Sequence, residues 1–82
     1  MGALMRQLKM KRDIIGVLRR TEGPMTVTQI LARLETRGVS YQAAWRFLRS
    51  LQDRGVLDTT TSGRLVSWGF RALPLFRNMK SR

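Results

Sequence analysis

The chain contains neither cysteine nor histidine. Disulfide bonds are therefore excluded, as are metal sites built from thiolate or imidazole ligands. The same absences remove the nucleophile–base pairs that many covalent enzymes use. We expect a protein that binds no metal and no cofactor and that is not an enzyme.

Acidic residues are also scarce. The chain has 5 of them, and they form no recognisable pair for acid–base catalysis. It has 16 basic residues, 13 of them arginine, which gives a formal net charge of +11. Arginine binds phosphates and guanine edges through paired hydrogen bonds. Such an excess of charge in a small domain favours a nucleic acid as partner over a merely solvated surface.

Long hydrophobic runs are missing as well. No apolar stretch approaches the roughly 18–20 residues that a membrane-spanning helix needs. Charged residues interrupt the N-terminal stretch too often for a secretion signal, and Arg6 stands where a myristoylation signal needs serine or threonine. We therefore expect no contact with a membrane and a cytoplasmic location, on the nucleoid or, for a viral chain, in the host cell.

A chain of 82 residues is long enough for one domain, which we expect over 1–82 with its core at about 12–70. Both ends are basic: residues 1–20 hold six basic residues and one acidic residue, and residues 64–82 hold five basic residues and no acidic one. The core is thus expected between a basic N-terminal segment, 1–11, and a basic tail, 71–82.

Apolar residues at helical spacing predict a first helix that ends near Arg20 and begins between Ala3 and Arg12. The stripe expected on it consists of Leu4, Leu8, Lys11, Ile15 and Leu18, with Met5 and Ile14 beside it. A second helix is predicted after Thr26, because Thr26 and Gln29 have the spacing of a capping box. Gly38 is expected to be its left-handed C-cap residue, which leaves a short connection to the next helix.

A third helix is predicted over residues 40–54, with Ser40 as N-cap and Gly55 as terminator. At 100° per residue the apolar face consists of Ala44, Leu48 and Leu51, with Phe47 at its edge. The opposite face consists of Gln42, Arg46, Arg49 and Asp53, and one flank holds Tyr41, Trp45 and Gln52.

The stretch VLDTTTSGRLVSWGF predicts a β-hairpin over 56–70 with Ser62 and Gly63 as its turn. This register pairs Leu57 with Trp68 and Thr59 with Val66. The face expected toward the core consists of Leu57, Thr59, Val66, Trp68 and Phe70. The fold class is therefore mainly α with a small hairpin (α+β), in the order of a winged helix-turn-helix: three helices and a C-terminal wing.

Two stretches, GPMTVTQILARL and VSYQAAWRFLRSLQDRGVL, resemble the winged-helix DNA-binding domains of bacterial and archaeal regulators such as the MarR-like group. In the second stretch the similar positions are Ser40, Ala44, Arg46, Leu48, Leu51, Gly55, Val56 and Leu57. The resemblance runs from Ile14 to about Phe70. It implies a winged-helix fold and a role in DNA binding.

If the third helix lies in the major groove, five of its residues are candidates for base contacts: Gln42, Arg46, Arg49, Tyr41 and Trp45. For Tyr41 and Trp45 two alternatives stay open. Their rings either pack against the first helix or the wing, or are exposed and contact thymine methyl groups, sugars, phosphate or a partner subunit. Candidates for phosphate contacts in the helices and the wing are Thr26, Thr28, Ser40, Ser62 and Arg64.

We expect a sequence-specific transcription regulator that binds double-stranded DNA. The alternatives are a non-specific architectural or RNA- or ribosome-associated protein, and a winged-helix module that binds proteins through its exposed aromatic residues. A homodimer is expected from two apolar clusters, unless these pack on the domain's own core: Leu4, Met5 and Leu8, and Leu73, Leu75 and Phe76.

Overall fold

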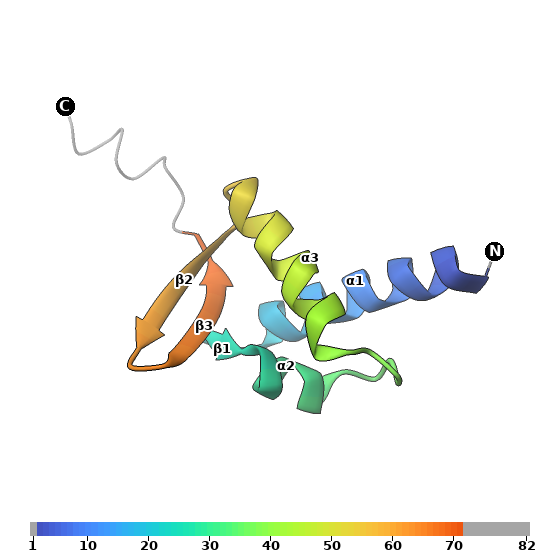
Figure 1. Ribbon diagram of the computed structural model, residues 1–82, viewed down its shortest axis with the longest axis horizontal. Coiled ribbons are helices and arrows are strands. Elements are labelled where there is room, and N and C mark those ends of the chain that lie inside the picture. The colour runs from blue at the N-terminus through green and yellow to red at the C-terminus, as the bar shows by residue number, and fades with distance from the viewer. Residues whose placement is uncertain (1, 72–82) are drawn as a thin grey trace.

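A computed structural model describes residues 2–71 of the chain. This range forms three helices and three strands, shown in Figure 1: α1 (Gly2–Arg20), β1 (Met25–Thr26), α2 (Val27–Arg33), α3 (Tyr41–Asp53), β2 (Leu57–Ser62) and β3 (Leu65–Phe70). The strands form an antiparallel sheet in the order β1-β3-β2. The architecture confirms the predicted α+β winged helix-turn-helix, in which α2 and α3 form the helix-turn-helix and β2 and β3 form the wing.

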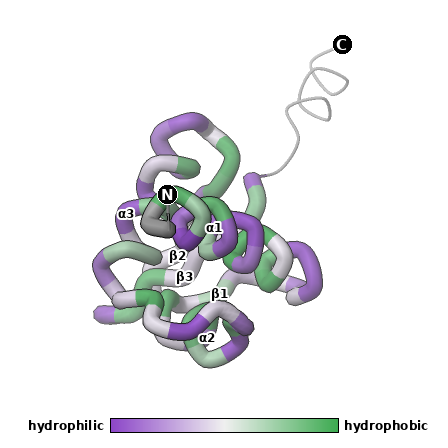
Figure 2. The backbone as a smooth tube through the Cα atoms, turned by 90° about the vertical axis from the view of Figure 1, so that its right-hand side faces the viewer, coloured by the Kyte–Doolittle hydropathy of each residue, from purple (hydrophilic) through white to green (hydrophobic). Residues whose placement is uncertain are grey.

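Helix α1 is buried only along its C-terminal half. Its core-facing side chains are Met10, Ile14, Val17 and Leu18. The predicted stripe was therefore wrong for Leu4, Leu8 and Lys11, which are exposed. These residues are exposed because α1 is long and its N-terminal half extends past the other elements (Figure 1). Figure 2, which looks toward this end, shows hydrophobic and hydrophilic residues alternating along α1.

Helix α2 begins as predicted and ends early. Thr26 Oγ1 accepts a hydrogen bond from the Gln29 N–H at 3.1 Å, and the Thr26 N–H donates to Gln29 Oε1 at 3.0 Å, which confirms the capping box. The helix ends at Arg33 because Leu34 is extended, with φ −72° and ψ 138°. Gly38 has a φ of +78° but lies in the loop, so its predicted role as C-cap was wrong. The connection to α3 spans residues 34–40.

Helix α3 has both predicted ends. Ser40 Oγ accepts from the Ala43 N–H at 3.1 Å, which confirms it as N-cap. At the other end the Gly55 N–H donates to the Gln52 carbonyl and the Val56 N–H to the Leu51 carbonyl, both at 2.9 Å. These two bonds form a Schellman motif. The motif needs a left-handed residue, and Gly55 supplies it with a φ of +82°.

The hairpin has a different turn from the predicted one. Ser62 pairs with Leu65, so Gly63 and Arg64 are the two turn residues. Gly63 has a φ of +62° and Arg64 has no positive φ, which is the pattern of a type II′ turn with glycine first. The predicted pairs are shifted by two residues: Leu57 faces Phe70 and Thr59 faces Trp68. Because side chains alternate with a period of two, the same residues still share one face.

The core lies between the sheet and the three helices. Side chains with at most 2% exposure come from every element: Ile14, Val17, Met25, Ile30, Ala44, Leu48, Leu57 and Trp68. The burial of Trp68, Ala44, Leu48 and Leu51 agrees with the sequence patterns, and Phe47 packs against this core at its edge. Val66 and Phe70 share the inner face but stay 39% and 46% exposed, so their predicted burial was wrong. Val66 pairs with Thr61 close to the turn, and the turn end of the wing extends away from the helices (Figure 1).

Candidate nucleic-acid interface

Helix α3 separates a buried face from a charged face. Ala44 and Leu48 are fully buried, and Leu51 is 8% exposed. Gln42, Arg46 and Arg49 are all exposed. A hydrophobic inner face holds the helix on the core, and the polar outer face is left in solvent along its length. The predicted separation of the two faces is confirmed.

The two arginines of the outer face differ in their surroundings. Arg49 Nε lies 3.6 Å from Asp53 Oδ1, and its guanidinium carbon lies 5.7 Å from the centroid of the Trp45 ring. For Arg46, residues 2–71 provide neither an ion pair nor a side-chain hydrogen bond. The sequence pattern predicted the same role for both arginines, but of these two only Arg49 has an ion pair within this part of the chain.

The aromatic flank of α3 is exposed rather than packed against α1 or the wing. Tyr41 is 55% exposed and Trp45 is 39% exposed. This exposure agrees with the second alternative for these rings, and what they contact stays a prediction. Tyr41, Gln42, Trp45 and Arg46 line a hollow of about 340 Å³ on the surface of the helix. Four of the five predicted base-contact residues therefore lie around one concave site.

The predicted phosphate contacts in the helices fall mainly on capping residues. The hydroxyl oxygens of Thr26 and Ser40 and the backbone N–H of Thr26 are used within their own helix ends. These groups fix where α2 and α3 begin. Thr28, in the first turn of α2, is exposed.

The wing presents Arg64 at its tip. Arg64 is in the turn and exposed, and Ser62 is the last residue of β2. A hydrogen bond that the sequence patterns did not predict connects the wing to α3: Gln52 Nε2 donates to Thr59 Oγ1 at 3.4 Å. Gln52 was placed on the correct flank, but its partner is seven residues away on another element, where helical periodicity gives no signal.

The loop before α3 is attached to α1 by Asp13. The Thr36 N–H donates to Asp13 Oδ2 at 2.7 Å. Partial burial raises the pKa of Asp13, but the hydrogen-bonding groups of Thr36, the backbone of Glu35 and the charge of Arg20 together outweigh this effect. The net result is a pKa below the ordinary value of 3.8, so the carboxylate is charged at neutral pH. Asp13 thus helps to position the N-terminal end of α3.

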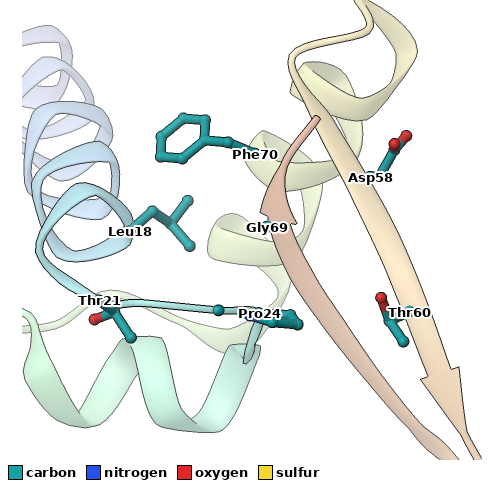
Figure 3. A pocket seen from close by; sticks show the side chains of 8 residues that line it. Leu18, Thr21, Pro24, Asp58, Thr60, Gly69 and Phe70 are labelled. Carbon is teal, nitrogen blue, oxygen red and sulfur yellow. The ribbon is translucent and has the colours of Figure 1, made fainter. Parts of the chain in front are cut away.

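Another hollow, of about 280 Å³, lies between the C-terminal end of α1, the loop 21–24 and the base of the wing. Figure 3 shows Leu18 of α1 and Phe70 of β3 both extending into the space between these elements. Among residues 2–71, the side chains that line this hollow come from elements other than α3. Asp58, a charged residue of this lining, is paired with Arg71 at 3.6 Å. No lysine or arginine of the described range lines this hollow, and Arg71 beside it is paired with Asp58.

Among residues 2–71 no three acidic side chains come together as a group that holds a metal ion. Within the same range, no helix combines the length and the apolar character that crossing a membrane requires.

No protein-family model matches the chain, and no curated protein matches it either. A solved structure does: an ArsR-like transcriptional regulator from Rhodococcus sp. RHA1, with a TM-score of 0.55 and 22% sequence identity over 99% of this chain and 75% of that one. The chain shares the fold of this regulator. The narrower resemblance to MarR-like regulators stays a prediction.

Proposed function

We propose that the protein is a sequence-specific transcription regulator that binds double-stranded DNA. The recognition helix, residues 40–54, lies in the major groove, and the wing, residues 56–70, contacts the backbone or the adjacent minor groove. The observation that carries this proposal is the outer face of α3, where Arg46 is exposed beside Gln42 and has no ion pair or side-chain hydrogen bond among residues 2–71. The net charge of +11 and the fold shared with a transcriptional regulator support it.

The dimensions of α3 suit the major groove. A helix with its side chains is about 10–12 Å across, and the groove is about 12 Å wide. Gln42 and Arg49 are seven residues apart, or roughly 10 Å along the axis, which corresponds to about three base pairs. In this position Arg46 donates to the O6 and N7 atoms of a guanine, and Gln42 pairs with an adenine edge. Arg49 contacts a phosphate or a second base.

The proposed phosphate contacts come from an arginine and from hydroxyl side chains. Arg64 at the wing tip is the first of these, assisted by the Ser62 hydroxyl, and Thr28 contributes from α2. For about six neutralised phosphates the affinity falls about a thousandfold between 50 and 200 mM salt, because each contact contributes about −0.9 to the log–log slope. A slope near zero would contradict the proposal.

The test is selection of bound sites from random duplex DNA, followed by fluorescence-anisotropy titration of the selected site and of a scrambled duplex. We expect an enriched motif and tighter binding to it. Enrichment of no motif, with equal binding to DNA and RNA, favours the architectural or RNA-associated alternative. Absence of any nucleic-acid complex at low salt would leave the protein-binding alternative.

We further propose that the protein binds DNA as a homodimer through the exposed part of α1. Leu4, Met5 and Leu8 are 62%, 66% and 49% exposed, so they do not pack on the domain's own core. The other predicted cluster, Leu73, Leu75 and Phe76, lies outside the described residues. A two-fold dimer predicts a palindromic site with half-sites about 10–10.5 base pairs apart. With this role we expect the protein in the cytoplasm.

Sedimentation tests the dimer with a matched pair of variants. Leu8→Glu puts one charge into the apolar cluster and should shift the protein toward the monomer. Gln7→Glu adds the same charge at the neighbouring exposed position and should leave the mass unchanged. A wild-type protein that sediments as a monomer at all concentrations contradicts this arrangement.

A further inference from the structure

The hollow on α3 is lined by two kinds of side chain in parallel rows. Tyr41 and Trp45 are four residues apart and so are Gln42 and Arg46, which places each pair on one line along the helix. One row is aromatic. The other carries an amide and a guanidinium group, both hydrogen-bond donors. No acidic residue is among those that line the hollow.

The aromatic row is held in place without being covered. The Arg49 guanidinium carbon lies 5.7 Å from the centroid of the Trp45 ring, a cation–π arrangement that restrains the ring. Even so, Trp45 stays 39% exposed and Tyr41 55%, whereas Trp68 in the core is 2% exposed. Two large rings in solvent beside donors that have no partner among residues 2–71 suit a ligand that presents an apolar group next to hydrogen-bond acceptors.

We propose that this hollow binds the C5-methyl group of a thymine next to the guanine that Arg46 contacts. In the major groove, thymine presents this methyl group beside its O4 acceptor, and a neighbouring purine presents N7. The rings of Tyr41 and Trp45 take the methyl group, and Gln42 and Arg46 donate to the acceptors. This inference rests on the proposed function and names the base that the aromatic row selects.

The lining disfavours other occupants. A cationic ligand or a basic peptide would meet Arg46 without an acidic partner in the lining. A deoxyribose has no methyl group and is the same for every base. The methyl group therefore separates thymine from cytosine and from uracil, and it gives the protein a means to prefer DNA over RNA.

The test replaces each thymine of the selected duplex in turn by deoxyuridine, which removes one methyl group and changes nothing else in the base pair. Burying a methyl-sized group corresponds to about fourfold in affinity. We expect a loss of about this size at one or two positions next to the guanine that depends on Arg46, and none elsewhere. The deoxyuridine substitutions need only the wild-type protein, so this part of the test does not depend on how a variant folds.

Three variants assign the effect to the hollow. Trp45→Ala and Tyr41→Ala should bind the thymine and deoxyuridine duplexes equally at the affected position. Tyr41→Phe keeps the ring and loses only the hydroxyl, so it should retain the loss of about fourfold. Circular dichroism shows whether each variant is folded.

Each other outcome has a distinct meaning. Sequence-specific binding that tolerates every deoxyuridine, or a selected motif with no thymine beside that guanine, overturns this inference and leaves the proposed function intact. A deoxyuridine penalty that is unchanged in Trp45→Ala and Tyr41→Ala shows that another part of the protein contacts the methyl group, which also overturns it. Absence of duplex binding overturns the proposed function, and this inference falls with it.

Discussion

Replacing Arg46 by alanine should impair DNA recognition and leave the fold unchanged. Arg46 is exposed and has no ion pair or side-chain hydrogen bond among residues 2–71, so its removal breaks no polar side-chain contact in this range. Surface substitutions of this kind change the free energy of unfolding by less than about 0.5 kcal/mol. A lost bidentate contact with guanine costs about 1–3 kcal/mol of discrimination, or roughly 5- to 150-fold in affinity for the selected site.

Arg49→Ala is the matched variant, with the same change of charge on the same face. It removes the ion pair with Asp53 and the stacking on Trp45. The pair is largely exposed, at 54% and 69%, so solvent weakens it and its share is about 0.3–0.5 kcal/mol. The stacking adds about 0.5–1 kcal/mol. The variant should therefore lose about 1 kcal/mol of stability, with a smaller effect on discrimination than Arg46→Ala.

Urea unfolding measures the stability of both variants, and anisotropy competition between the selected and the scrambled duplex measures discrimination. The reasoning is wrong if Arg46→Ala weakens both duplexes by the same factor, because Arg46 then contacts a phosphate and not a base. It is also wrong if Arg46→Ala destabilises the fold more than Arg49→Ala does.

Three further substitutions test the ends and connections of α3. Ser40→Ala removes the acceptor for the Ala43 N–H and should lower the free energy of unfolding by about 1 kcal/mol in urea titrations, whereas an unchanged midpoint would argue against the cap. Gly55→Ala forces a side chain into a left-handed φ and places its Cβ 3.1 Å from Arg71 Nη1, so it should cost about 1–2 kcal/mol, measured in the same way. Asp13 has a lowered pKa, so its contribution is present at neutral pH and is lost as the pH falls below the ordinary value of 3.8. Asp13→Asn should therefore show a weaker loss of stability between about pH 5 and pH 2 than the wild type, and parallel curves would contradict the contact with Thr36.

The parts of the fold that the sequence predicted well depend on interactions between residues close in the chain. Thr26 and Gln29 are three residues apart, and the capping box that they form is a local structure. The Schellman motif at Gly55 is also local, since its bonds join residues within five positions. The division of α3 into two faces follows from helical periodicity alone.

The parts that were wrong or missed depend on contacts between distant residues. Strand β1 is two residues long and exists because Met25 and Thr26 pair with Trp68 and Ser67, more than forty positions away. Helix α2 ends early, and the loop that follows it is fastened by Thr36 to Asp13, 23 positions earlier. Neither the pairing of β1 with β3 nor the bond between Thr36 and Asp13 leaves a periodic pattern in the sequence. Periodicity also predicted the apolar stripe of α1 without showing how far the helix extends past the core.

The corrected turn of the hairpin bears directly on the proposed contact of the wing with DNA. With Ser62 and Gly63 as turn residues, Arg64 would begin the second strand and pair with Thr61. With Gly63 and Arg64 as turn residues, Thr61 pairs with Val66 and Arg64 lies at the outer end of the wing.

Arg64 is exposed and belongs to the turn, so the alternation of side chains between the two faces of the sheet does not determine the direction of its side chain. It can therefore extend to a phosphate or into the minor groove while Gln52 and Thr59 connect the wing to α3. In the proposed complex with DNA, the position of Arg64 relative to Arg46 therefore depends on how the wing is attached to α3.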